Sequence, residues 1–191
     1  KIILDQVKKF HQYKFKKINK FNIYKNYAFK LNKRLGFLST KLKKDNASHI
    51  KKVFKRLNKY ENNNLGKMSL IHGDLVFTNI FADGANNIKL VDPRGGMHKK
   101  FSIFGDLFYD YAKIYQSVSG YEHILKNKIY EQEYFYKVKD FFENYFKINF
   151  GVEKLSDLKY LTSSLYLSLI PLHEKRFTQN FIHLGKKILI G

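Results

Sequence analysis

The stretch LIHGDLVFTN (residues 70–79), followed by LVDPRG (residues 90–95), decides the fold of this 191-residue chain. Short apolar runs occur at residues 68–71, 79–82 and 88–91, and the last two are separated by the sequence DGANN. Turn-forming residues between two short apolar runs predict a β-hairpin. The expected order is therefore a strand, a loop, a hairpin and an acidic turn.

Helical patterns surround this segment on both sides. Apolar residues recur at three- and four-residue spacing, as at Ile50, Phe54 and Leu57, which is typical of an amphipathic helix. Helices are expected within residues 1–60, beyond Gly105, around residues 131–146, and at residues 156–170 and 173–189. Asp45 or Asn46 could cap the later helix within residues 1–60. The predicted fold class is mainly α with a small β-hairpin insert (α+β).

Composition excludes several classes of protein. The chain has no cysteine, so disulfides, thiolate zinc sites and a cysteine nucleophile are ruled out. The longest apolar run, residues 165–172, is too short to cross a bilayer, and the N-terminus has no signal-peptide pattern. The seven histidines show no metal-binding spacing. We therefore expect a cytoplasmic protein with no transmembrane segment and no zinc site.

The net charge of +20 is concentrated in the first third of the chain. Residues 1–60 contain 19 Lys/Arg and 2 Asp/Glu. Residues 14–21 alternate lysines with aromatic rings, a pattern that could follow a nucleic-acid backbone. Only four of the 36 cations are arginine, however, which favours solvated lysines on helix faces over specific nucleic-acid binding. An acidic neighbouring domain, an anionic substrate and a membrane surface remain alternatives.

Three oxygen-bearing side chains stand out in the central segment. Asp74 and Asn79 are five residues apart, the separation of Asp and Asn in the catalytic loop of kinases. Asp92 ends the second hairpin strand, where Pro93 stops ladder pairing. Phosphoryl transfer requires a group that orients the acceptor hydroxyl and oxygen ligands that hold magnesium against the phosphates. These residues could provide both.

The segment resembles the His-Gly-Asp-(four residues)-Asn loop and the following Asp turn of the aminoglycoside phosphotransferase and choline kinase-like superfamily, which has a protein-kinase-like fold. The resemblance implies that Asp74 is the catalytic base or hydroxyl-orienting residue. It also implies that Asn79 and Asp92 bind Mg²⁺ and the nucleotide, ATP or another nucleoside triphosphate, and that His72 braces the loop. The turn around Asp92 is similar to variants in bacterial small-molecule kinases, which favours a small-molecule acceptor.

A second stretch, GDLFYDYAK (residues 105–113), resembles the helix that follows the metal turn in these kinases. The resemblance implies that Asp110 accepts hydrogen bonds from backbone N–H groups of the catalytic loop and so supports it. The alternative is that Asp106 and Asp110 are ordinary first-turn acids favoured by the helix dipole.

The resemblance implies a kinase-like C-terminal lobe over residues 1–191. It divides into a basic helical segment (residues 1–67), a catalytic loop and metal hairpin (68–95) and a helical substrate-side subdomain (96–191). Neither a glycine-rich phosphate loop nor a strand lysine precedes the site. We therefore expect the N-terminal lobe to be absent from this chain, and we expect the chain alone to show no appreciable ATP turnover.

The predicted function is Mg-ATP-dependent phosphorylation of a small-molecule hydroxyl. Acids are scarce outside the catalytic set, which disfavours a polycationic aminoglycoside and favours a neutral or anionic sugar or headgroup-like metabolite for surface (capsule) polysaccharide synthesis. His173 or Glu174 could contact this acceptor, and Tyr109, Tyr111, Tyr115 and Tyr121 could instead cage a quaternary ammonium such as choline. A catalytically inactive scaffold and a basic nucleic-acid-binding domain are the alternative functions.

Overall fold

The computed structural model describes residues 1–13, 26–97, 100–126 and 132–190, and this part of the chain is mainly helical with small antiparallel sheets. It confirms the predicted class of mainly α with a small β insert. The lysine-aromatic stretch at residues 14–21 and Glu131 lie outside the described residues. Among the described helices, none is long and apolar enough to cross a membrane.

In the described residues, four helices precede the first strand. They are α1 (Ile2–His11), α2 (Tyr27–Leu35), α3 (Thr40–Asp45) and α4 (Ala47–Asn62). Asn46 is the residue before α4, but its side chain makes no capping hydrogen bond with that helix. Its Nδ2 instead donates to the Leu42 carbonyl of α3 at 3.0 Å. The chain leaves α4 through Asn64, which has a φ of 50°.

Three two-stranded antiparallel sheets follow in the described residues. β1 (Met68–Leu70) pairs with β6 (Phe104–Asp106), β2 (Ile80–Ala82) with β3 (Ile88–Leu90), and β4 (Gly96–Met97) with β5 (Lys100–Phe101). The β2–β3 pair confirms the predicted hairpin. The Asp83 carboxylate stabilises its turn by accepting from the Ala85 and Asn87 backbone N–H groups at 2.9 and 2.8 Å.

The pairing of β1 with β6 positions the functional site. β1 leads into the 71–79 loop, which ends in a 3₁₀ turn (Phe77–Asn79), and β6 leads directly into α5 (Leu107–Val118). The Leu107 N–H also donates to the Lys67 carbonyl at 2.9 Å. The start of the loop and the start of α5 therefore lie side by side, although nearly forty residues separate them.

The remaining helices are α6 (Tyr121–Lys126), α7 (Gln132–Phe150), α8 (Val152–Leu169) and α9 (Thr178–Lys187). α8 begins four residues before the predicted start, because Gly151 takes a φ of 89° and lets α7 and α8 follow one another directly. α9 begins five residues after its predicted start, because the residues around Pro171 form two short 3₁₀ turns, Ile170–Leu172 and Lys175–Phe177.

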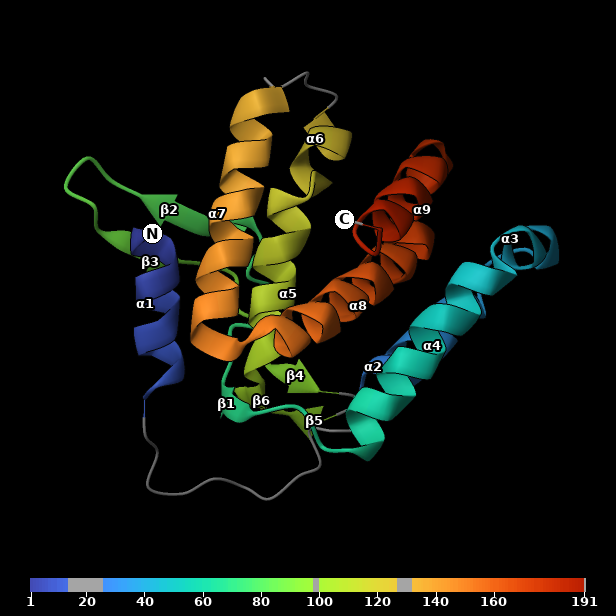
Figure 1. Ribbon diagram of the computed structural model, residues 1–191, viewed down its shortest axis with the longest axis horizontal. Coiled ribbons are helices and arrows are strands. Elements are labelled where there is room, and N and C mark those ends of the chain that lie inside the picture. The colour runs from blue at the N-terminus through green and yellow to red at the C-terminus, as the bar shows by residue number, and fades with distance from the viewer. Residues whose placement is uncertain (14–25, 98–99, 127–131, 191) are drawn as a thin grey trace.

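Helices α5 and α8 form the centre of the molecule. Figure 1 shows α8 crossing its middle, with α5 and α7 on one side and α2 and α4 on the other, and α8 contacts all four. Every residue of α5 is buried. Two hydrogen bonds join the pair, from the Tyr166 hydroxyl to the Gln116 carbonyl at 2.7 Å and from Thr162 to the Ala112 carbonyl at 3.3 Å. Polar side chains on α5 therefore have to find partners inside the protein.

Candidate functional site

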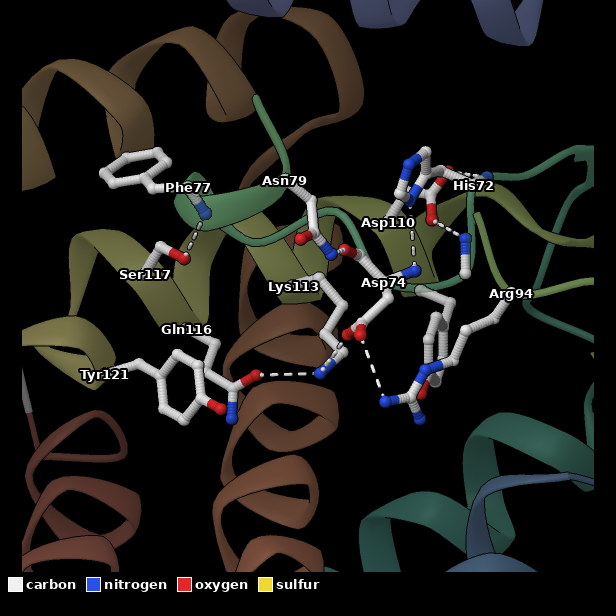
Figure 2. Close-up of polar contacts among 12 residues, drawn as sticks. His72, Asp74, Phe77, Asn79, Arg94, Asp110, Lys113, Gln116, Ser117 and Tyr121 are labelled. Atoms are coloured by element: carbon white, nitrogen blue, oxygen red, sulfur yellow. Dashed lines mark hydrogen bonds and ion pairs between the residues drawn. The ribbon is translucent and has the colours of Figure 1, made fainter. Parts of the chain in front are cut away.

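The 71–79 loop is attached to α5 by the carboxylate of Asp110. Asp110 is fully buried and accepts from the backbone N–H groups of His72 and Gly73 at 2.7 and 2.8 Å. The ring nitrogen Nε2 of His11, from α1, lies 3.0 Å from the same carboxylate. These are the backbone hydrogen bonds that the kinase resemblance implied for Asp110 (Figure 2).

His72 joins the loop to the end of the hairpin. Its Nε2 lies 2.9 Å from the Val91 carbonyl oxygen, and its Nδ1 accepts from the Asp74 N–H at 3.3 Å. Because a carbonyl oxygen only accepts hydrogen bonds, this arrangement places the ring proton on Nε2. The ring thus holds the backbone of Asp74 against the strand that leads to Asp92.

Gly73 allows the loop to approach the acidic turn closely. Its φ is +80°, and a Cβ atom built there would lie 3.0 Å from the Arg94 carbonyl oxygen. The Arg94 N–H donates to the His72 carbonyl at 2.8 Å across the same contact. A side chain at position 73 would strain the backbone and push the two segments apart.

The far end of the loop is also attached to α5. The Phe77 N–H donates to the Ser117 hydroxyl at 3.0 Å and to Glu122 at 3.1 Å. The Ser117 hydroxyl itself donates to Glu122 at 2.6 Å. The loop is therefore held at both ends by polar side chains of α5 and of the residues that follow it.

The Asp74 carboxylate lies between two cations. Lys113 Nζ is 2.9 Å from one oxygen, and the Arg94 guanidinium is 3.1 Å from the other (Figure 2). Burial acts against ionisation of Asp74, but Lys113, Arg94 and Lys30 outweigh it and hold its pKa below its ordinary value. Asp74 is therefore a carboxylate at neutral pH, suited to accepting a hydrogen bond and weak as a proton acceptor.

The three oxygen-bearing residues predicted from the sequence come together. Asp74, Asn79 and Asp92 all line one cavity of about 310 Å³. Asn79 Nδ2 donates to the Asp74 carbonyl at 2.8 Å, which leaves its Oδ1 as the amide atom able to bind a metal ion. Asp92 follows β3, is exposed, and has a φ of +55°, a conformation that costs free energy in a residue other than glycine.

This donor set fits magnesium better than zinc. Among the described residues, no group of three or more His, Asp or Glu side chains is placed to hold a metal ion. Mg²⁺ needs only one or two protein oxygens, because water and phosphate complete its coordination. Asn79 Oδ1 and the Asp92 carboxylate are oxygens of that kind on one cavity wall.

The sequence did not reveal the basic residues around Asp74. Lys113 also donates to Gln116 at 3.2 Å, and Lys30 of α2 donates to the hydroxyl of the buried Tyr109. Burial raises the pKa of Tyr109, but Lys30 and Lys113 outweigh this and lower it. The position of Lys113, three residues after Asp110 on the same helix face, is the one sequence signal that could have indicated it.

Asp106 lies outside the cavity and has a structural role. Its carboxylate accepts from the hydroxyls of Tyr27 and Tyr60 at 2.8 and 2.6 Å, and from the N–H groups of Lys67 and Phe108 at 3.0 and 3.1 Å. Burial raises its pKa. It caps α5 and joins it to α2 and α4, so the view of Asp106 as an ordinary first-turn acid was incomplete.

The other acceptor-contact candidates separate into two groups. His173 lines the same cavity, 3.4 Å from the Tyr121 hydroxyl, whereas Glu174 is exposed and pairs with Arg176. Tyr111 and Tyr115 are buried in the core. The idea of a four-tyrosine cage is therefore wrong, because only Tyr121 of the four lines the cavity that contains Asp74.

Comparisons with known proteins gave no match to any family model, curated protein or solved structure.

Proposed function

We propose that this chain is the catalytic C-terminal lobe of a Mg-ATP-dependent phosphotransferase with a protein-kinase-like fold, acting on a hydroxyl of a small molecule. The observation that carries the proposal is the convergence of Asp74, Asn79 and Asp92 on one cavity. They come from two segments, a braced loop and the turn after a hairpin, that are joined by His72 and by the Arg94 N–H. Phosphoryl transfer depends mainly on such positioning.

Asp74 would orient the acceptor hydroxyl. The Asp74 carboxylate is ionised and rigidly held, so the acceptor hydroxyl would donate a hydrogen bond to one of its oxygens. A lone pair of the hydroxyl oxygen would then face the phosphoryl group. Its lowered pKa favours this orienting role over early proton removal. Lys113 and Arg94 would fix the carboxylate and hold positive charge next to the reacting oxygen atoms.

Asn79 and Asp92 would hold the magnesium ion. The hydrogen bond from Asn79 Nδ2 to the Asp74 carbonyl couples the metal side of the cavity to the acceptor side. When bound, Mg²⁺ with the nucleotide supplies the phosphoryl group and neutralises charge on the phosphate oxygens. The acceptor would be a sugar or headgroup-like metabolite for surface polysaccharide synthesis, because the cavity is too basic for an aminoglycoside.

Phosphoryl transfer from Mg-ATP to a panel of hydroxyl compounds, measured with the protein purified at its full natural length, tests this proposal. We expect Asp74→Asn to lower kcat by at least about 100-fold, since it removes the orienting charge. Asp92→Ala should abolish Mg²⁺-dependent nucleotide binding. Asp140→Asn, at an exposed acid on α7, is the matched control and should leave both unchanged.

Two results would contradict the proposal. One is transfer that persists in Asp74→Asn. The other is nucleotide binding that does not depend on Mg²⁺ or on Asp92, which would favour the scaffold alternative.

A further inference from the structure

Helix α2 presents two cations to the cavity that contains Asp74. Lys30 and Arg34 are four residues apart, so they share one helix face, and both line this cavity. The neighbouring face of α2 is packed into the core by the buried residues Tyr27, Leu31 and Leu35. The two cations are therefore carried by a packed helix and not by a loop.

Positive charge exceeds negative charge in this cavity. Its lining includes Lys30, Arg34, Arg94 and Lys113, against the acids Asp74 and Asp92. Arg94 and Lys113 share the single carboxylate of Asp74. Lys30 donates a hydrogen bond to the Tyr109 hydroxyl. Arg34 forms no ion pair with any residue that the structure describes. Within the described part of the chain, neither Lys30 nor Arg34 is therefore paired with a carboxylate.

The cations extend away from the proposed metal ligands. A second cavity, of about 340 Å³, also contains Lys30, Arg34 and Arg94, but neither Asn79 nor Asp92. The acid in its lining, Asp106, is occupied by the two tyrosine hydroxyls. The basic wall therefore continues beyond the cavity that contains the proposed metal ligands.

We propose that Lys30 and Arg34 bind an anionic group of the acceptor, a carboxylate or a phosphate, and so place its hydroxyl at Asp74. A guanidinium binds either anion through two parallel hydrogen bonds. The inference rests on the proposed function, because it names the substrate class of the same site. It narrows the acceptor from neutral or anionic to anionic.

Binding to the purified protein without nucleotide or metal tests this site. Isothermal titration calorimetry would compare galacturonate with galactose, and glycerol 3-phosphate with glycerol. Each pair differs mainly in charge. We expect the anionic member to bind at least about tenfold more tightly. Arg34→Gln should remove most of this preference, and Lys30→Gln serves as a second variant if Arg34→Gln does not fold. Lys44→Gln, at an exposed lysine of α3, is the control and should retain the preference.

The result that overturns the inference is equal affinity for the charged and neutral members, or a preference that survives in both α2 variants. Competition gives a further arm: displacement of galacturonate by Mg-ATP would assign the cations to the nucleotide phosphates and would also overturn it. The protein could bind the anionic compounds and still transfer no phosphoryl group to any of them. That result would refute the proposed function but would support the anion site.

Discussion

A carboxylate without solvent contact needs hydrogen-bond donors, and Asp110 has three of them in the His72 and Gly73 N–H groups and the His11 ring. At the scale of single residues, the candidate site depends on such buried polar groups more than on its exposed ones. Asp92, the exposed member, would contribute a ligand atom to the proposed metal site, whereas Asp110 and His72 determine where Asp74 lies.

Replacing Asp110 with alanine should destabilise the protein strongly. The change leaves two buried N–H groups and one imidazole without an acceptor, and we expect the free energy of unfolding to fall by about 3 kcal/mol. Urea denaturation measures this. Asp140→Ala, an exposed aspartate on α7, should change it by less than about 0.5 kcal/mol. A loss below about 1 kcal/mol in the Asp110 variant would show that water or another donor arrangement replaces the carboxylate.

Gly73→Ala should also be costly, for a different reason. Alanine is unfavourable at a φ of +80°, and its Cβ would lie 3.0 Å from the Arg94 carbonyl oxygen. We expect a loss of about 1–3 kcal/mol, seen as a lower Tm. At Gly84, in the hairpin turn, a Cβ would meet nothing within 4 Å, so Gly84→Ala is the matched control. Equal effects of the two substitutions would contradict this account.

The sequence predicted the acidic and amide residues of the site and missed the basic ones. Asp74 and Asn79 are recognisable because their spacing is local and their chemistry is specific. Lys30 and Lys113 are two of many lysines in a chain with 36 Lys and Arg residues. Apart from the position of Lys113 three residues after Asp110, nothing in the local sequence distinguishes a lysine that reaches a carboxylate from one in solvent, because the contact depends on how α2 and α5 pack.

At the scale of elements, helices α4, α8 and α9 meet around His49. The Ser163 hydroxyl donates to the Gly185 carbonyl at 2.8 Å and lies 3.3 Å from His49 Nε2. Burial, with smaller contributions from Lys186 and Lys52, lowers the pKa of His49 to about 4. The three helices therefore pack around a neutral imidazole.

This packing should make the protein sensitive to acid. In the unfolded chain His49 takes up a proton near pH 6.5, whereas in the folded protein it does so only near pH 4. The unfolded state thus binds more protons in this window, and the free energy of unfolding decreases as the pH falls from about 6.5 to about 4. We expect His49→Gln to flatten this part of the stability curve, measured by urea denaturation at several pH values.

His183→Gln, at an exposed histidine on α9, should retain the pH dependence of the wild type. If the His49 variant is as acid-sensitive as the wild type, other groups are responsible for the loss.

Element types were easier to predict than element ends and partners. The β2–β3 hairpin and the long helices follow from local patterns, and the structure contains them. The pairing of Met68 with Asp106 does not, because two three-residue strands 36 residues apart carry no local signal for one another. The starts of α8 and α9 depend on the Gly151 conformation and on the turns around Pro171, both of which are set by tertiary packing.

At the scale of the whole molecule, stability should depend on the central pair of helices. Leu161 of α8 is 1% exposed in the core, whereas Leu172, past the end of α8, is 48% exposed. Leu161→Ala should lower the free energy of unfolding by about 2–5 kcal/mol through lost burial and an unfilled cavity. Leu172→Ala, the same chemical change, should cost less than about 1 kcal/mol. Comparable losses in chemical denaturation would mean that α8 is not central to the core.

Helix α5 and its N-cap residue carry polar anchors on one side. Asp106, Asp110, Lys113 and Ser117 follow at intervals of four, three and four residues, and each serves a different neighbour. Inserting a single amino acid midway would turn the downstream half by about 100° and uncouple these anchors together. Evolution can therefore lengthen the β2–β3 tip freely, but it can vary α5 only by substitution.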